Sequence, residues 1–393
     1  MTQQSGARSL IQNLAIPVTF FVIFFALGSI QPFLIPFLRH RFPSLPPVQC
    51  SMVLATVYFS FGVFRFLAGY LIYALGSKQT VVLGAVGYFL FALLVYVLRV
   101  YALIMLAAVV WGIAASLFWT AGSTQVLDSS DRAQYGIRAG VLNLSAKIGI
   151  TLGVAVLGAI LERHGYGGLF SVALAIGSVG VLTAFLIPNS PHRAGWPQWR
   201  GLGDFYVRRR GIIMAAVFVV PGLAYGHMLG LINLYIIDTV GEAYVGRITS
   251  TFLASGVLFS LIGGQASDRF GRRLPLVISF LLGAGGLLSM SYPTNPWILA
   301  CGAFLLGVQF GTVPTVILAW VGDHVPPGER ALGHASIFAW RDLGIGVSIL
   351  LGGSFTQWGW PYRSVFLLSA SIFLMAALVS WAFVTEAAGT ARR

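Results

Sequence analysis

The chain has 393 residues, of which 57% are hydrophobic and only 9% are charged, and its mean hydropathy is +0.85. Soluble domains carry about 25% charged residues, so this composition excludes a water-soluble globular protein. The 47 glycines and the 13% of aromatic residues suit membrane helices, in which glycine is frequent and aromatic rings lie at the interfaces. We therefore predict an all-α polytopic membrane protein.

The net charge of +13 does not indicate nucleic-acid binding, because the basic residues lie in short loops between long apolar stretches. Two cysteines, Cys50 and Cys301, are too few for a disulfide framework or a zinc site. The sequence contains no Walker-type phosphate loop, no H-E-x-x-H and no G-x-S-x-G. We expect no enzymatic activity, no cofactor, no bound metal and no nucleic-acid partner.

A bilayer core about 30 Å thick needs about 20 apolar residues per helix. On that scale the sequence predicts twelve transmembrane helices, with approximate ranges 10–37, 48–75, 80–98, 101–127, 138–161, 167–187, 211–237, 248–267, 274–292, 297–322, 333–356 and 363–384. The first range is too long for the apolar core of a cleavable signal peptide. The polar linker 189–210 separates one six-helix bundle, 1–188, from a second, 211–393.

Lysine and arginine in short loops mark the cytoplasmic side of a membrane protein. They are more numerous in the loops that share a side with the two termini and the linker. We therefore expect both termini and the basic linker to be cytoplasmic, in a plasma (inner) membrane, and we expect a monomer surrounded by the lipid bilayer.

The two halves resemble each other when the first is shifted by 195 positions. The matched pairs are Gly69 with Gly264, Gly76 with Gly271, Gly112 with Gly307, Asp128 with Asp323, Gly149 with Gly344 and Gly158 with Gly353. Because each half has six helices, both halves insert in the same sense, as a parallel repeat. We expect pseudo-symmetric bundles with a cavity between them near the middle of the membrane.

The loop after helix 8 contains Gly264, Asp268, Arg269, Gly271, Arg272 and Arg273, in the order G-x-x-x-D-R-x-G-R-R. This resembles the loop signature of the major facilitator superfamily, which normally stands between helices 2 and 3. The equivalent first copy keeps Gly69, Gly76 and Lys78 but has Tyr73 in place of the acid. The loops that contain Asp131-Arg132 and Glu329-Arg330 are also similar to that superfamily. The resemblance covers the whole chain and implies a transporter with twelve helices.

The resemblance implies a role for this loop as a gate. In the family, contacts between the charged residues of this loop and neighbouring helices hold the outward-open state. These contacts break when the transporter opens to the cytoplasm. Asp268 is expected to accept hydrogen bonds from a helix N-terminus or to pair with an arginine at the cytoplasmic rim. The arginines of the loop are equally well explained as charges that fix the topology.

Few charges lie within the predicted helices. They are Arg65 in helix 2, Lys147 in helix 5, and Arg341 and Asp342 in helix 11. At 1.5 Å per residue from the helix ends, Arg65, Lys147 and Asp342 all lie roughly 13–17 Å deep. A charge that faces lipid costs several kcal/mol. We therefore expect these residues to line a water-filled cavity.

The family fold places helix 2 beside helix 11, so Arg65 and Asp342 are predicted to pair. Three cations then share one acid, and such an excess of charge needs an anion, water or loss of a proton to relieve it. Lys147 is one of two lysines among 24 basic residues, which suggests a need for a titratable cation. The alternative is that Lys147 binds a backbone carbonyl or reaches toward the membrane surface.

Uncharged side chains complete the expected cavity. The amides Gln31 and Asn233 match when Gly28-Ser-Ile-Gln31 is laid on Gly230-Leu-Ile-Asn233. His227 is a candidate proton carrier, although a lone histidine is more often a packing residue. The remaining candidates for contact with a substrate, each of which is also explained by ordinary packing, are Trp111, Trp119, Tyr225, Tyr235, Gln309 and Trp340.

These features predict a secondary transporter that works by alternating access. The leading substrate class is a small organic anion bound by Lys147 and Arg341, with Asp342 available for proton coupling. An alternative is a proton-coupled exporter of drugs or amphipathic metabolites, favoured by the aromatic residues of helices 4 and 7. A lipid flippase or scramblase on the same fold is a further alternative. A signalling receptor is the last alternative, but the sequence shows no sensory domain that would support it.

Overall fold

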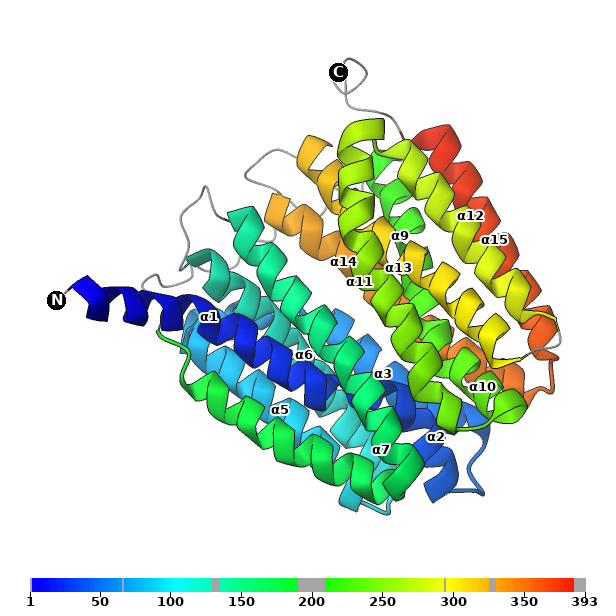
Figure 1. The fold of residues 1–393 in the computed structure, drawn as a ribbon, viewed down its shortest axis with the longest axis horizontal. Helices are drawn as coiled ribbons and strands as arrows, with labels where there is room; N and C mark the ends of the chain where they lie inside the picture. Colours follow the sequence, from blue (N-terminus) through cyan, green and yellow to red (C-terminus); the bar gives the residue numbers. More distant parts are fainter. Residues whose placement is uncertain are drawn as a thin grey trace. The chain divides into compact units, whose positions relative to one another are not determined.

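The computed structural model describes residues 2–65, 67–128, 135–189, 209–292, 295–324 and 330–384. Almost all of these residues lie in helices (Figure 1), which confirms the predicted all-α class. The helices pack into two compact units. The first unit contains Met1–Gln31 and Thr56–Pro197, and the second contains Pro32–Ala55 and Gln198–Arg393.

The first six predicted helices are present, two of them interrupted. Helix 1 is formed by α1 (Thr2–Ala26), a 3₁₀ turn (Gly28–Ile30) and α2 (Gln31–Arg41). Helix 2 is formed by α3 (Pro47–Arg65) and α4 (Ala68–Leu75). Helices 3 and 4 are α5 (Ser77–Val97) and α6 (Tyr101–Asp128). Helices 5 and 6 both lie within α7 (Tyr135–Phe185), and the non-helical backbone of Gly165, with a φ of 63°, separates one from the other.

The second half repeats this order. Helix 7 is formed by α9 (Arg209–His227), a π-helical turn η3 (Met228–Ile232) and α10 (Asn233–Val240). Helices 8 to 10 are α11 (Ala243–Phe270), α12 (Arg273–Met290) and α13 (Pro296–His324). Helices 11 and 12 are α14 (Arg330–Gln357) and α15 (Tyr362–Phe383). Every predicted helix therefore falls on a helix of the structure.

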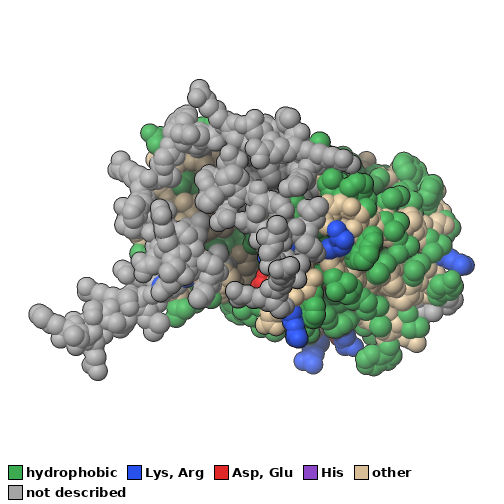
Figure 2. Space-filling model, turned by 90° about the horizontal axis from the view of Figure 1, so that it is seen from above, with side chains coloured by type: hydrophobic (Ala, Val, Ile, Leu, Met, Phe, Trp, Pro, Cys, Tyr) green, Lys and Arg blue, Asp and Glu red, His purple; other side chains and the backbone are tan. Residues whose placement is uncertain are grey.

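Ten helices among the described residues are long and apolar enough to cross a membrane. One of them, Gly140–Phe185, has 46 residues, so at 1.5 Å per residue it is long enough for two crossings. The eleventh predicted helix coincides with α14. On the face drawn in Figure 2, hydrophobic side chains cover much of the described part, with only a few lysine or arginine side chains between them. This surface is suited to contact with lipid.

The interruption of helix 1 follows from Pro32 and Pro36, two of its three prolines. Proline has no backbone N–H, so Pro32 cannot bond the carbonyl of Gly28 and Pro36 cannot bond that of Pro32. The chain changes from α-helix to a 3₁₀ turn immediately before Pro32. Helix 7 is interrupted at the matching place by its π-helical turn. As a result Gln31 and Asn233 are each the first residue of an outer helical segment, α2 and α10.

The packing inside each unit confirms the internal repeat. A Cβ on Gly112 would collide with the backbone of Val57, and a Cβ on Gly307 would collide with the backbone of Phe252. Val57 and Phe252 are themselves related by the shift of 195 positions. The helix pairs also match: α1 packs on α7 and α5 on α6 in the first unit, and α9 packs on α14 and α12 on α13 in the second.

The two compact units differ from the predicted bundles at one place. Residues 32–55, which comprise α2 and the first half of α3, pack with the C-terminal helices. Within this unit, a Cβ on Gly353 of α14 would collide with Ser51 of α3. The sequence repeat therefore defines the halves, whereas the observed contacts place the outer segments of helices 1 and 2 on the second half.

Close packing at the repeat glycines can be tested by stability. The substitution Gly307→Ala places a methyl group against the carbonyl of Phe252, so we expect a loss of about 1–3 kcal/mol and a lower Tm in detergent. The matched control is Gly285→Ala on α12, where nothing lies within 4 Å of the added methyl group. Equal Tm values for the two variants would contradict the close approach.

Candidate functional site

The buried acid of helix 11 is held by its own neighbour in the sequence. Asp342 has 0% of its surface exposed. Arg341 donates two hydrogen bonds to Asp342 Oδ1, from Nε at 3.0 Å and from Nη2 at 2.7 Å. The Arg341 guanidinium also lies 4.7 Å from the ring centroid of Phe338. Neighbouring residues on a helix point about 100° apart, but the arginine side chain is long enough to reach around the helix from Arg341 to Asp342.

The two other cations predicted to lie within the helices belong to the first unit. Arg65 of α3 is half-buried, with its guanidinium 4.5 Å from the ring centroid of Phe61. Lys147 of α7 is also half-buried. The structure assigns Arg65 and Asp342 to different compact units, and their pairing stays a prediction.

Lys147 and Asp342 occupy equivalent positions in the two repeats, since they are 195 residues apart. Two residues after each of them, a glycine packs against the backbone of another helix: Gly149 against Phe21 of α1, and Gly344 against Val219 of α9. Two residues correspond to about 200° on a helix. Both ionisable side chains therefore leave their helices on the side opposite the close packing. This equivalence follows from the shift of 195 positions that relates the two halves.

His227 of α9 makes hydrogen bonds through both ring nitrogens. Nδ1 lies 2.6 Å from Ser348 Oγ of α14, and Nε2 lies 2.7 Å from Ser369 Oγ of α15. The Ser348 hydroxyl donates to the carbonyl of Leu223, so it accepts a hydrogen bond from Nδ1–H. The neutral imidazole then accepts at Nε2 from Ser369. Sequence reasoning singled out His227 but did not find the two serines that hold it.

The two matched amides bond to different helices. Gln31 Oε1 accepts a hydrogen bond of 2.6 Å from the Tyr58 hydroxyl. Asn233 is fully buried, donates from Nδ2 to the carbonyl of Pro32 at 3.0 Å and accepts from the Thr249 hydroxyl at 3.0 Å. The Pro32 carbonyl is the one that Pro36 leaves without a helical partner. The amide of helix 7 thus satisfies the broken backbone of helix 1.

Several of the other candidate side chains are enclosed by packing. Trp111 is 1% exposed and stacks on Phe91 with ring centroids 4.1 Å apart. Tyr225 stacks on Phe310 at 4.9 Å. Gln309 is fully buried, and neither atom of its amide has a hydrogen-bond partner in the described part of the chain. Their predicted contact with a substrate stays untested.

The remaining candidates are less enclosed. Trp119 is half-buried, and its ring lies 5.1 Å from the ring of Phe24 and 5.3 Å from that of Phe20. The Tyr235 hydroxyl donates to the carbonyl of Met290. Trp340 is exposed. These three residues also stay predictions as contacts of a substrate.

The signature loop forms a compact local network. The chain turns at Gly271, which has a φ of 82°, as its equivalent Gly76 does with 87°. Arg272 is 9% exposed and donates to Asp268 Oδ1 at 2.7 Å and to the Ser267 hydroxyl at 2.8 Å. Asp268 therefore pairs with an arginine, but this arginine belongs to its own loop. Its role as a gate stays a prediction.

The two neighbouring arginines of the loop contact aromatic rings. Arg273 donates to the carbonyl of Val384 and lies 5.5 Å from the ring of Trp381. Arg269 lies 5.3 Å from the ring of Phe270. Asp131 and Glu329, which support the resemblance in other loops, and Asp323, which the internal repeat matches to Asp128, lie outside the residues whose side chains the structure describes.

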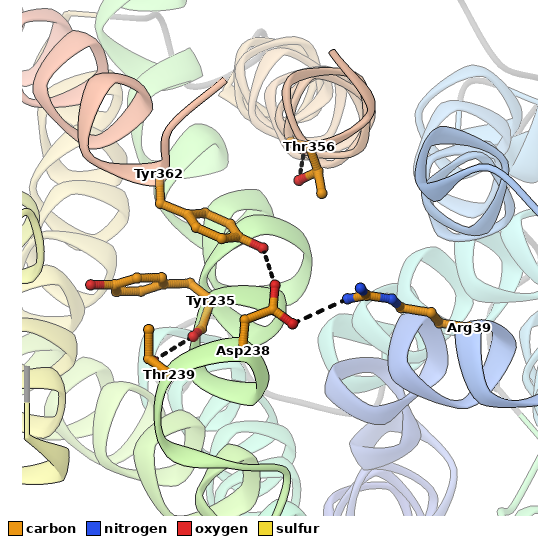
Figure 3. A network of polar contacts seen from close by, with 7 residues as sticks. Arg39, Tyr235, Asp238, Thr239, Thr356 and Tyr362 are labelled. Carbon is orange, nitrogen blue, oxygen red and sulfur yellow. Dashed lines mark hydrogen bonds and ion pairs between the residues drawn. The ribbon is translucent and has the colours of Figure 1, made fainter. Parts of the chain in front are cut away.

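A polar network that sequence reasoning missed lies at the ends of α2 and α10 (Figure 3). Asp238 accepts from Arg39 Nη1 at 3.4 Å through Oδ1 and from the Tyr362 hydroxyl at 2.6 Å through Oδ2. The signal available in the sequence was the opposite charge of these two residues, which lie near the ends of the matched helices 1 and 7.

Comparison with known proteins decides the family. The sequence profile described as Major Facilitator Superfamily matches residues 18–243 and 214–393. The chain belongs to the major facilitator superfamily. This confirms the family predicted from the signature loop, and the protein is a multi-span membrane transporter.

Individual members of the superfamily are distant relatives. The proton-coupled antiporter flippase LtaA of Staphylococcus haemolyticus (strain JCSC1435) is 22% identical over 361 residues, which cover 89% of each chain. The 4-hydroxybenzoate transporter PcaK of Acinetobacter baylyi (strain ATCC 33305 / BD413 / ADP1) is 28% identical over 150 residues, 37% of this chain and 32% of PcaK. The crystal structure of the nucleoside transporter NupG has a TM-score of 0.74 at 15% identity and covers 95% of this chain and 99% of that one. This likeness shows a shared fold.

The Arg341–Asp342 pair predicts an asymmetric response to mutation. Removing one partner of a buried ion pair costs about 3–5 kcal/mol, because the other charge is left uncompensated. Asp342 is fully buried whereas the Arg341 side chain is 22% exposed. We therefore expect Arg341→Ala to lower the Tm more than Asp342→Ala, and the double variant to recover part of the loss.

A parallel cycle with Arg65→Ala tests the second pairing predicted for Asp342. Partial recovery in the Arg65→Ala/Asp342→Ala double variant would support that pair, and additive losses would contradict it. Both cycles are read by thermal unfolding of the purified protein in one detergent.

Proposed function

We propose that this transporter moves a small organic anion across the membrane by alternating access. In this proposal Lys147 and Arg341 bind the anion, and its transport is coupled to protons. The observation that carries the proposal is the imbalance of charge among the membrane-embedded ionisable residues. Arg341 and Asp342 neutralise each other through two hydrogen bonds. Among the charges predicted to lie within the helices, Arg65, Lys147 and Arg341 are three cations and Asp342 is one acid, so positive charge is in excess.

Arg341 retains the ability to bind a ligand. Its Nε and Nη2 donate to Asp342, and among the described residues no bond to its Nη1 is found. Its side chain is 22% exposed, whereas that of Asp342 is fully enclosed. A guanidinium that is fixed by a carboxylate and stacked on a ring offers its remaining donors in a set direction. Carboxylates are the ligands that such donors bind best.

Lys147 is the proposed titratable cation. It occupies the position equivalent to Asp342 and points away from the contact of α7 with α1. A protonated lysine and a bound anion stabilise each other, so the proton and the substrate bind with positive linkage. In this proposal Asp342 and His227 are the further residues that take part in proton transfer or charge pairing.

Uncharged residues are proposed to give the site its shape and its polar contacts. Gln309 supports this proposal because a buried amide without a partner is costly unless a ligand or water satisfies it. The other residues proposed to contact the substrate or to support those that do are Gln31, Asn233, Trp111, Trp119 and Tyr225. The signature loop from Gly264 to Arg273 is the proposed gate on the cytoplasmic side.

The relatives support two different substrate classes. PcaK carries a carboxylate in its name, which favours an organic anion, although it matches only 37% of this chain. LtaA matches 89% of the chain and is named as a proton-coupled antiporter flippase. It favours proton coupling and, as the second candidate function, the export of an amphipathic or lipid-like molecule.

The anion proposal is tested by binding at several pH values. We expect Lys147→Ala to weaken binding of a confirmed carboxylate substrate, identified by a thermal-shift screen that begins with anions, by roughly 10- to 100-fold. Wild-type affinity should fall as the pH rises through the titration of Lys147. The Lys147→Arg variant keeps the positive charge, and an arginine stays protonated at all the pH values of the experiment. The affinity of this variant for the carboxylate should therefore depend less on pH.

The matched control is Lys78→Ala, which removes the other lysine of the chain at the beginning of α5. This variant should bind the carboxylate with wild-type affinity and wild-type pH dependence. Unchanged binding by Lys147→Ala, or a screen that returns only cations, would contradict the anion proposal. Ligands that are all neutral and amphipathic would support the second candidate function instead.

A further inference from the structure

Helix 7 and helix 11 approach each other closely within the second unit. Two glycines four residues apart, Gly222 and Gly226, lie on the α9 side of this contact. A Cβ on Gly222 would collide with the carbonyl of Arg341, and one on Gly226 would collide with the carbonyl of Ile345. The part of the α14 backbone that carries the Arg341–Asp342 pair therefore rests directly on helix 7.

The glycine contacts hold α9 and α14 together without fixing one helix strongly along or around the other. They are van der Waals contacts, each of which is weak and has little directional preference. Hydrogen bonds between side chains and backbone depend steeply on distance and angle. The register of α14 on α9 is therefore set mainly by the hydrogen bonds between the two helices.

Ser348 of α14 makes two such bonds. Its hydroxyl donates to the carbonyl of Leu223 at 2.9 Å and accepts from Nδ1–H of His227 at 2.6 Å, and the side chain is 0% exposed. Ser348 lies seven residues after Arg341, which is almost two full turns of helix, so both side chains leave α14 on the same side. A shift of α14 that breaks the bonds of Ser348 would also change the direction of Arg341.

We propose that Ser348 is a positioning residue for Arg341. By fixing the register of α14 on α9, it fixes the direction in which the guanidinium presents the donors that Asp342 does not use. A guanidinium binds a carboxylate through a planar fork of N–H groups, so its affinity depends on that direction. This inference rests on the anion binding of the proposed function, and Ser348 acts through Arg341 without touching the anion.

The first half has a glycine in place of this serine. The residue equivalent to Ser348 is Gly153 of α7, where a Cβ would collide with the carbonyl of Phe25 of α1. The close approach of the two helices is thus kept, but the hydroxyl is not. The cation of that half is Lys147, whose ammonium has rotatable donors and needs no set direction. The hydroxyl therefore occurs in the half whose cation has a directional donor group.

The first measurement is affinity for a carboxylate. The probe is the tightest-binding carboxylate of the anion screen, in which benzoate represents the monocarboxylates and succinate the dicarboxylates. We expect Ser348→Ala to weaken its binding roughly three- to ten-fold, about the effect of one hydrogen bond. If Ser348→Ala does not fold, Ser348→Cys keeps the volume but donates weakly, and should shift the affinity in the same direction.

The matched control is Ser354→Ala on the same helix. The Ser354 hydroxyl donates to the carbonyl of Leu350, which belongs to α14 itself, so this side chain does not connect α14 to α9 through that bond. The control variant should bind the carboxylate with wild-type affinity.

Dependence on Arg341 separates positioning from general damage to the fold. Arg341→Lys keeps the charge but has rotatable donors, so its binding does not need a set direction. In that background Ser348→Ala should change the affinity by less than about two-fold, whereas in a Lys147→Arg background the loss should persist in full. General damage would lower the affinity by the same factor in both backgrounds.

The register itself can be measured without a substrate. Spin labels at Ile212→Cys on α9 and Leu351→Cys on α14, both exposed positions, report the distance between the two helices by pulsed EPR in lipid nanodiscs. The labels are placed in a background without the native cysteines. We expect Ser348→Ala to broaden the distance distribution by about 1.5 Å, the rise of one residue, and Ser354→Ala to leave it unchanged.

Four results would overturn the positioning role: wild-type affinity in Ser348→Ala, an equal loss in Ser354→Ala, an undiminished loss in the Arg341→Lys background, or an unchanged distance distribution. A loss of affinity in Lys147→Ala but not in Ser348→Ala would overturn this inference alone and leave the anion proposal intact. Wild-type affinity in both variants would contradict the anion proposal as well.

Discussion

The hydrogen bond from Asn233 to the carbonyl of Pro32 joins helix 1 to helix 7 at the point where both are interrupted. It exists because a backbone polar group inside a membrane protein must find a partner within the protein. Pro36 removes the partner that the Pro32 carbonyl would have in a regular helix. The outer segment α2 is therefore positioned by a side chain of the second half, and the ion pair at its outer end depends on that alignment.

The same requirement distributes the polar groups of the interior. Asp342 is tolerated at 0% exposure because Arg341 gives it two hydrogen bonds, and His227 is tolerated because two serines satisfy both nitrogens. Buried ion pairs add little net stability, since the loss of hydration offsets the attraction. Their retention in a membrane interior is better explained by a task that needs charge.

The sequence predicted the helices, the repeat and the family because these depend on local or periodic signals: apolar length, glycine spacing and the loop from Gly264 to Arg273. The sequence could not predict that the Arg341 side chain bends toward Asp342, because helix geometry gives only the direction in which a side chain leaves the helix and not the rotamer that it adopts. It also missed the bonds of Ser348 and Ser369 to His227 and that of Tyr362 to Asp238, because these partners lie on other helices and their residue types are common in membrane helices.

The repeat separates the scaffold from its chemistry. Gly112 and Gly307 each lie against the backbone of another helix at equivalent positions of the two halves, and so do Gly149 and Gly344. A larger side chain at any of these four positions would push the two helices apart. The positions that face away from this packing have diverged: Lys147 corresponds to Asp342, and Tyr73 corresponds to Asp268. Close packing constrains every residue at a helix contact in both copies, whereas a binding residue is constrained only by its ligand. Opposite charges at one equivalent position therefore point to two different tasks, and we propose anion binding for the lysine and charge pairing for the acid.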